Sequence, residues 1–251
     1  MILYADYHTH STYSGDGKGT MEANVQSAIA KGLKVLAISD HGPGHMGYGI
    51  KYHKYPEMRE EIDRLQQKYP EIKLLLGIEA NVMDDQGHLD VDERFLKYND
   101  ILLAGYHFGS SPKEKITDLK MHFYNVMSKK SEYYFKKAQE YNTRAFIRAI
   151  ENNSIQILTH PGAKGPAILS EVAKVAVLRG TALEINNSHG HLTYEEILEV
   201  KDSGCMFTIN SDAHRPENIG KFSNGIERAE RAGITEDRIL NARLNLIDMG
   251  K

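Results

Sequence analysis

The sequence has a single cysteine, no long apolar run and almost no net charge. Cys205 cannot form a disulfide within the chain, and at the start of the apolar run CMFTI it is expected to be a small buried core residue rather than a reactive thiol. No stretch approaches the roughly 18 apolar residues that cross a bilayer. The opening MILYA is short and lacks the basic flank of a secretory signal. We therefore expect a soluble, cytoplasmic protein.

The charges are balanced in number and mixed along the chain. Lys and Arg total 31 against 34 Asp and Glu, which gives a formal net charge of −3. The sequence thus lacks the polycationic surface that dominates binding to duplex DNA or RNA. A small anionic substrate stays compatible, because a local metal cluster can supply a positive field. We expect a small phosphorylated partner, with no strong nucleic-acid binding and no membrane; the oligomeric state stays open.

Seven short apolar runs alternate with amphipathic segments. The runs are nearly continuous in apolar character, as in parallel strands buried on both faces; they are ILYADYH, KVLAISDH, IKLLLGIEAN, DILLAGYH, IQILTHP, ALEINN and CMFTINSDAH. The segments between them predict helices over 21–31, 56–69, 131–152, 169–179, 194–202 and 236–249. Gly32, Gly180 and Gly204 are expected to follow three helices as caps. This alternation favours a closed or nearly closed (β/α) barrel, with a doubly wound sheet as the other choice. No phosphate-binding glycine fingerprint supports a dinucleotide fold.

No composition break, linker or short-period repeat divides the chain. Residues 1–251 are expected to form one domain, because α/β barrels reach this size as single domains. One stretch is less regular, the Lys-rich segment FGSSPKEKITDLKMHFYNVMSKK over residues 108–130. Long loops in compact domains tend to be functional or mobile, so this segment is either a lid over the site or plain solvated surface.

The ends of the predicted strands carry side chains of metal-ligand type. His8 and His10 are two positions apart, so they project from one face of the first strand. The later strand ends carry His41, Glu79, His107, His160, the pair Asn186 and Asn187, and Asp212 with His214. In a (β/α) barrel the carboxyl ends of the strands surround one opening. Six of the 12 histidines and two carboxylates would meet there, which favours bound metal ions over like dipoles and charges packed together.

Other polar residues flank these strand ends. Asp16, in YSGDGKG, either bends back to the same rim or forms an Asp-Gly turn. Asp6 and Asp40 adjoin the ligand candidates and either orient imidazole rings or cap turns. Candidates for substrate contact are Lys18, His45, Lys164, His189, His191 and Arg215, of which the cations suit a phosphate. The remaining histidines are expected on the solvated surface: His53, His88 and His122.

The motifs DYHTHSTYSGD, ISDHGP, GIEAN, AGYH, THPG, LEINN and NSDAH together resemble the PHP (polymerase and histidinol phosphatase) superfamily of metal-dependent phosphoesterases. The resemblance implies a distorted (β/α)7 barrel with a trinuclear metal centre at the carboxyl ends of its strands. It implies a first metal site of His8, His10, Glu79 and Asp212. Glu79 would also bridge to a second site with His107 and His160, and the third site would comprise Asp16, His41 and His214. Some members have a histidine in place of Asp16, and either residue type binds divalent ions.

The ligand types predict the chemistry. Imidazole and carboxylate without thiolate suit Zn²⁺ or Mn²⁺, with Fe²⁺ also compatible. Two ions sharing Glu79 would share a water and lower its pKa towards neutrality, and a third would bind a phosphoryl oxygen. We expect a phosphomonoesterase that hydrolyses small phosphomonoesters by attack of a metal-bridging hydroxide. Its catalytic residues would be Glu79, Asp212 and His214.

Several other functions are alternatives to this prediction. Histidinol phosphate is one candidate substrate, because SDAHRPENIGKF resembles the last motif of those phosphatases, whereas DHGPGH and GIEANV resemble a less specific branch, which we favour. Amidohydrolases also begin with His-x-His but often bridge their metals with a modified lysine and use eight strands. A polymerase-associated nuclease would need a basic track for single strands. A non-catalytic metal-binding module would lack ligands, and none of the expected ones is missing.

Overall fold

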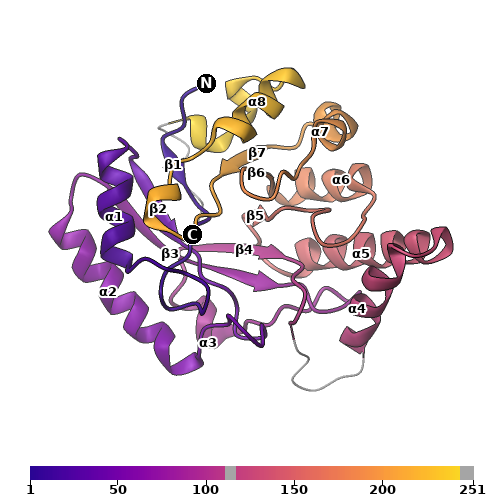
Figure 1. Cartoon of the computed structure of the whole chain (residues 1–251), viewed down its shortest axis with the longest axis horizontal. Helices are drawn as coiled ribbons and strands as arrows, with labels where there is room; N and C mark the ends of the chain where they lie inside the picture. Colours follow the sequence, from indigo (N-terminus) through magenta and orange to yellow (C-terminus); the bar gives the residue numbers. More distant parts are fainter. Residues whose placement is uncertain (111–116, 244–251) are drawn as a thin grey trace.

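The computed structural model describes residues 1–110 and 117–243, in which seven parallel strands lie side by side in chain order. The strands are β1 (Ala5–Asp6), β2 (Val35–Ile38), β3 (Lys73–Asn81), β4 (Ile101–Gly105), β5 (Ile157–Leu158), β6 (Ala182–Asn186) and β7 (Phe207–Asn210). Each falls within one of the seven apolar runs. Figure 1 shows the helices arranged around the outside of the strands. The predicted class is confirmed: the chain forms a nearly closed, distorted (β/α)7 barrel.

Side chains complete the seam between β1 and β7. Thr9 and Ala213 form one parallel bridge. Lower down, the Asn241 amide donates to the carbonyl oxygens of Ala5 at 2.9 Å and Ile209 at 2.7 Å, and the Ile209 N–H donates back to Asn241 at 3.1 Å. An amide carries both a donor and an acceptor, so it can substitute for strand-to-strand hydrogen bonds. The first and last strands are therefore held together without a regular ladder.

Eight helices and five short 3₁₀ segments connect the strands within the described residues. The helices are α1 (Met21–Ala30), α2 (Tyr55–Lys68), α3 (Glu93–Leu96), α4 (Thr117–Ser128), α5 (Glu132–Asn152), α6 (Leu169–Arg179), α7 (Tyr194–Val200) and α8 (Ser223–Arg231). The 3₁₀ segments are η1 (Tyr52–Lys54), η2 (Lys201–Ser203), η3 (Pro216–Asn218), η4 (Glu236–Arg238) and η5 (Leu240–Ala242). Gly32, Gly180 and Gly204 have φ of +78°, +70° and +86°, which confirms their predicted place after helices.

The prediction of a helix over 236–249 is wrong for those of its residues that the structure describes. Residues 236–242 form the two short segments η4 and η5, because Asn241 must turn its side chain inward to the seam; residues 244–249 lie outside the described residues. The sequence also failed to indicate α8. Gly225 interrupts its helical pattern, but a Cβ there would lie 2.5 Å from Ile209 Cγ2, so the glycine allows α8 to approach β7 closely.

The irregular segment predicted over 108–130 is also largely helical. Helix α4 occupies residues 117–128 and packs on α5, with Met121 buried and the Asn125 amide paired with Asn142. Its apolar contacts with α5, which the local sequence does not reveal, favour the helix over a loop. Residues 111–116 lie outside the described residues, so the lid stays a prediction.

Two apolar clusters build the core. The inner cluster comes from strands and their ends alone and contains Ala5, Tyr7, Val35, Ala37, Leu75, Ile101, Leu103 and Ile157. The larger cluster joins the outward faces of the strands to the helices, and it includes Cys205, which is buried as predicted. Within residues 1–110 and 117–243, no helix is both long and apolar enough to cross a membrane. The inner cluster closes the barrel below the strands' carboxyl ends, and the polar site lies above it.

Candidate metal centre

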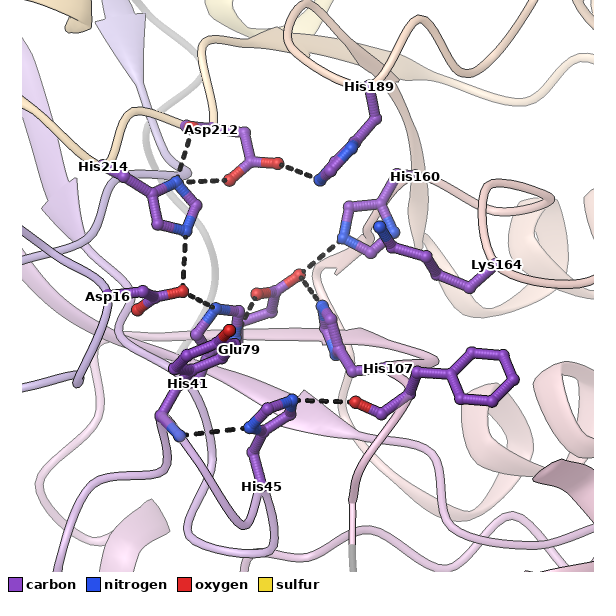
Figure 2. Close-up of a pocket in the computed structure, with 12 residues that line it drawn as sticks. Asp16, His41, His45, Glu79, His107, His160, Lys164, His189, Asp212 and His214 are labelled. Carbon is purple, nitrogen blue, oxygen red and sulfur yellow. Dashed lines mark hydrogen bonds and ion pairs between the residues drawn. The ribbon is translucent and has the colours of Figure 1, made fainter.

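The predicted ligands meet at the carboxyl ends of the strands (Figure 2). They surround a cavity of about 380 Å³, whose lining consists of Asp16, His41, His45, Tyr48, Glu79, His107, Phe108, His160, Lys164, His189, Asp212 and His214. The two remaining predicted ligands, His8 and His10, are fully buried and contact Glu79 and Asp212. The structure therefore brings all nine residues into one group.

Glu79 lies at the centre of this group, fully buried on β3. Its Oε2 is 3.2 Å from His8 Nε2 and 3.0 Å from His41 Nδ1, while its Oε1 is 3.0 Å from His160 Nε2 and 3.3 Å from His107 Nε2. Burial would raise the pKa of Glu79, but the imidazoles of His107, His8 and His160 hold it well below its usual range. The carboxylate is therefore anionic, and its two oxygens face different imidazoles; His10 Nε2 also lies 3.8 Å from Oε2.

Asp212, just after β7, faces the same group from the opposite side. Its Oδ1 lies 3.3 Å from His10 Nε2 and 3.6 Å from His8 Nε2, and its Oδ2 lies 3.2 Å from His189 Nε2. Burial opposes ionisation, but His8, His10 and His189 lower the pKa of Asp212 well below the ordinary value. Among the described residues, only Asp212 (φ +52°) and His160 (φ +29°) are non-glycine residues with positive φ. Such strain is typical of functional positions, and here it aims two side chains at the cavity.

Asp16 bends back to the rim from the loop after β1. Its Oδ2 lies 3.2 Å from His41 Nε2 and 3.1 Å from His214 Nε2, and Ser14 Oγ donates to its Oδ1 at 2.9 Å. Partial burial raises the pKa of Asp16, but hydrogen bonds from His214 and His41 outweigh it, so the net shift is downward. The loop aspartate therefore lies with the two imidazoles with which the resemblance grouped it.

The ring nitrogens that face away from the centre have partners that orient the imidazoles. His8 Nδ1 donates to Glu184 Oε1 at 2.8 Å, and His107 Nδ1 donates to Asn81 Oδ1 at 2.8 Å. His214 Nδ1 donates to a backbone carbonyl at 3.1 Å. Each ring is left with Nε2 directed at the cavity. Metal-ligating histidines generally have such a partner on the other nitrogen.

The chemistry of this group fits divalent metal ions. Several buried atoms have no hydrogen-bond partner, namely His8 Nε2, both ring nitrogens of His10, His41 Nδ1 and Glu79 Oε2. Leaving such atoms unsatisfied costs about 1–3 kcal/mol each. Their ligand atoms form sets within 4.8 Å of one another, including His8 with Glu79 and His160, His41 with Glu79 and His107, and His8 with His10 and Asp212. Ions placed among these donors would satisfy them, and nitrogen and oxygen donors suit Zn²⁺, Mn²⁺ or Fe²⁺.

Sequence reasoning missed Glu184, which is fully buried in β6. Besides His8, it accepts hydrogen bonds from the Asn210 amide at 2.9 Å, the Asn186 amide at 2.9 Å and the His160 N–H at 2.9 Å. Burial raises its pKa, but His8 outweighs that effect and lowers it. A charge inside the apolar run ALEIN, two positions before Asn186 and so on the same strand face, was the available signal.

The neighbouring polar residues have different roles. Asn186 donates to Asp212 Oδ2 at 3.0 Å, whereas Asn187 Oδ1 accepts N–H groups at the start of α8 and so lies outside the site. Asp6 accepts hydrogen bonds from Ser211 and Gly220 at the seam, and Asp40 accepts two from Ser11. Burial raises the pKa of Asp6 and of Asp40 to about 6. Asp6 therefore stabilises the backbone turns at the seam. Asp40 differs in that its Oδ1 also lies 3.9 Å from His10 Nδ1.

The candidates for substrate contact divide into two groups. Lys164, His45 and His189 line the cavity. Three others lie outside its lining: Lys18 and Arg215, both exposed, and His191, which bonds to Glu196. Figure 2 shows the Lys164 side chain reaching towards His160. Among the lysines that the structure describes, only Lys164 lines the cavity.

Comparisons with known proteins find a matching family and similar sequences. The PHP domain model matches residues 6–188. A protein named probable phosphatase from Thermoanaerobacter sp. is 31% identical over 266 residues, covering 100% of this chain and 93% of its own. Another of that name from Caldanaerobacter subterraneus is 30% identical and covers 98% of this chain and 89% of its own.

A solved structure shares the fold. It is histidinol phosphate phosphatase from Lactococcus lactis, complexed with zinc, L-histidinol and phosphate, which superposes with a TM-score of 0.62 at 19% identity and covers 94% of this chain and 95% of its own. Its likeness extends over nearly the whole barrel. With the family model matching most of the chain and curated relatives aligning over its full length, the protein belongs to the PHP domain family.

Proposed function

We propose that this protein is a metal-dependent phosphatase that hydrolyses small phosphomonoesters at a centre of three divalent ions. The observation that carries the proposal is Glu79, a buried anion whose two oxygens face separate groups of imidazoles. A carboxylate in that position suits a bridge between two ions. The names of the curated relatives support phosphatase activity.

The donor sets support three neighbouring sites. His8, His10, Glu79 and Asp212 would hold the first ion, and Glu79 with His107 and His160 the second. Asp16 would complete the third with His41 and His214, because its Oδ2 lies 3.2 Å from one imidazole and 3.1 Å from the other. When bound, such ions supply a hydroxide nucleophile at neutral pH and offset charge that develops on the phosphoryl oxygens.

The chain's own residues would bind and align the phosphoryl group. Lys164 lines the cavity with no ion-pair or hydrogen-bond partner among the described residues, so its ammonium is available to a phosphoryl oxygen. Glu79, Asp212 and His214 would act as the catalytic residues, since their charges and ring nitrogens hold the reacting groups at the cavity. The Nε2–H of His189, at 3.2 Å from Asp212 Oδ2, keeps that carboxylate in place.

The alternatives have less support. A central carboxylate occupies the place where an amidohydrolase would have a bridging lysine, and all nine ligand residues are present, unlike in a module that has lost binding. Histidinol phosphate stays a candidate substrate, because the Lactococcus lactis structure of the same fold holds L-histidinol and phosphate. At 19% identity that likeness concerns the fold, so it does not decide the substrate.

A panel of phosphorylated metabolites that includes histidinol phosphate tests the proposal. The protein is loaded with Mn²⁺ or Zn²⁺, and phosphate release is measured for each compound. We expect hydrolysis of phosphomonoesters by the loaded protein and loss of that activity in Glu79→Gln protein loaded in the same way. Absence of phosphate release from every compound with a fully metal-loaded protein would contradict the proposal.

A further inference from the structure

Two aromatic side chains at the cavity are more exposed than a core residue would be. Tyr48 and Phe108 both line the cavity, yet they are 43% and 42% exposed. Their rings adjoin the metal-ligand group, since the Tyr48 centroid lies 6.0 Å from that of His41, and Phe108 follows His107 directly. Exposed aromatic surface beside a polar cavity is typical of ligand contact. Nothing in the proposed phosphoryl chemistry uses it.

Tyr48 is held in place by His45. The two rings stack with centroids 4.5 Å apart and an angle of 11° between their planes. His45 Nδ1 accepts the N–H groups of Tyr48 at 3.1 Å and Gly47 at 3.3 Å, so its proton lies on Nε2, which donates to the Phe108 carbonyl at 2.9 Å. Both nitrogens are therefore engaged by the backbone. His45, which lines the cavity and stays a predicted substrate contact, thus also supports the tyrosine.

Phe108 is supported in the same way by His122. Their rings stack with centroids 5.5 Å apart at 25°. The Tyr106 hydroxyl donates to His122 Nδ1 at 2.6 Å, and His122 Nε2 donates to the Ser110 carbonyl at 2.8 Å. The prediction that His122 is a solvated surface residue is therefore wrong, because the side chain joins α4 to the end of β4.

The two loops that carry these aromatics are also joined to each other. Besides the bond from His45 to the Phe108 carbonyl, the Met46 N–H donates to the Gly109 carbonyl at 3.0 Å, and His45 forms an antiparallel bridge with Ser110. We call Tyr48, Phe108 and their two supporting imidazoles the aromatic rim. Two stacked pairs fixed by hydrogen bonds are preorganised, so a ligand that contacts them orders little further.

We propose that the aromatic rim selects phosphomonoesters whose alcohol carries a flat ring, which packs on Tyr48 and Phe108 while the phosphoryl group faces Glu79 and Lys164. The inference rests on the proposed function and names its substrate class. A flat ring offers a face and an edge to an exposed aromatic side chain, whereas a puckered ring of the same size does not. Aromatic pairs gain enough beyond their buried area to change affinity about twofold to tenfold.

Benzyl phosphate and cyclohexylmethyl phosphate test this choice. Both are esters of primary alcohols with the same carbon skeleton, so they differ mainly in whether the ring is flat. We expect kcat/KM of the metal-loaded protein to favour the benzyl ester by about threefold to tenfold. The dissociation constants of benzylphosphonate and cyclohexylmethylphosphonate, which cannot be hydrolysed, should differ in the same direction in calorimetry.

Variants test whether the preference for the benzyl ester depends on the aromatic rim. Tyr48→Ala and Phe108→Ala should each bring the benzyl-to-cyclohexylmethyl ratio towards one, and Tyr48→Phe should retain it. Phe123→Ala is the matched control, because Phe123 is 51% exposed but lies outside the cavity lining; it should leave the ratio unchanged. Tyr48→Leu replaces Tyr48→Ala if the smaller side chain impairs folding.

The outcomes separate the two proposals. Equal kcat/KM values and equal phosphonate affinities in the wild-type protein would overturn the aromatic rim while leaving phosphatase activity intact. A flat-ring preference that survives both alanine variants would also overturn it. Failure to hydrolyse either ester, or any compound of the panel, would count against the phosphatase, and phosphonate binding would then still decide the role of the rim.

Discussion

The two ends of the barrel strands differ in what their side chains contact. On β3, Leu75 and Glu79 share one strand face; Leu75 packs in the inner apolar cluster, whereas Glu79 lies among imidazoles at the upper end. The contacts at the lower end are made between apolar side chains, which need no hydrogen-bond partner. At the upper end, buried nitrogens and oxygens lack hydrogen-bond partners. The same strand thus contributes stability at one end and a binding site at the other, as in other (β/α) barrels.

The largest effect should come from the centre of the upper end. Glu79→Gln keeps the shape but removes the charge, so turnover of a phosphomonoester should fall by orders of magnitude. The barrel should stay folded, as judged by circular dichroism, because the inner cluster is untouched. Near wild-type turnover in this variant would make Glu79 a structural residue and erase the proposed difference between the two ends.

The converse change is at the lower end. Leu75→Ala opens a cavity in the inner cluster, where Leu75 is buried, and should lower the free energy of unfolding by about 2–5 kcal/mol. Metal content and turnover per folded molecule should match the wild type. Urea unfolding and elemental analysis measure the two quantities. Loss of bound metal without loss of stability would show that the two ends are not separable.

A smaller effect is expected one contact away from the ligands. Glu184→Gln removes the anion that accepts from His8 Nδ1, and such partners typically change metal affinity about 10–100-fold. Competition with a chelator of known affinity measures this change. Glu217→Gln, at a side chain that is 64% exposed, is the control and should not alter metal affinity. Equal affinities for both variants would restrict the metal centre to its direct ligands.

The smallest effect should be at Asp16, the ligand that no strand positions. Asp16→Ala should weaken or lose one ion, leave the pair around Glu79 in place, and lower the rate at fixed metal concentration by about tenfold, roughly one removed charged contact. Added metal should partly restore activity, and Asp16→His should be milder. Full metal content and full activity in Asp16→Ala would reduce this residue to a turn aspartate.

The sequence predicted the strands and the ligand residues at their carboxyl ends better than the segments that connect the strands. Strand ends are marked locally by apolar runs that stop at His, Glu or Asp, and barrel closure then brings them together. Helix α8 and the residues after it could not be predicted, because their conformations depend on close packing at Gly225 and on Asn241 at the seam. His45 was placed at the cavity, but its role depended on hydrogen bonds from a distant loop.

The number of bound ions tests the central claim most directly. Protein stripped with a chelator, reconstituted with Mn²⁺ or Zn²⁺ and freed of excess metal should contain close to three ions per chain in elemental analysis, because nine ligand residues form overlapping donor sets. Uptake should raise the thermal unfolding temperature, since ions bind the folded chain. One ion or fewer per chain after reconstitution would contradict a trinuclear centre at the upper end of the barrel.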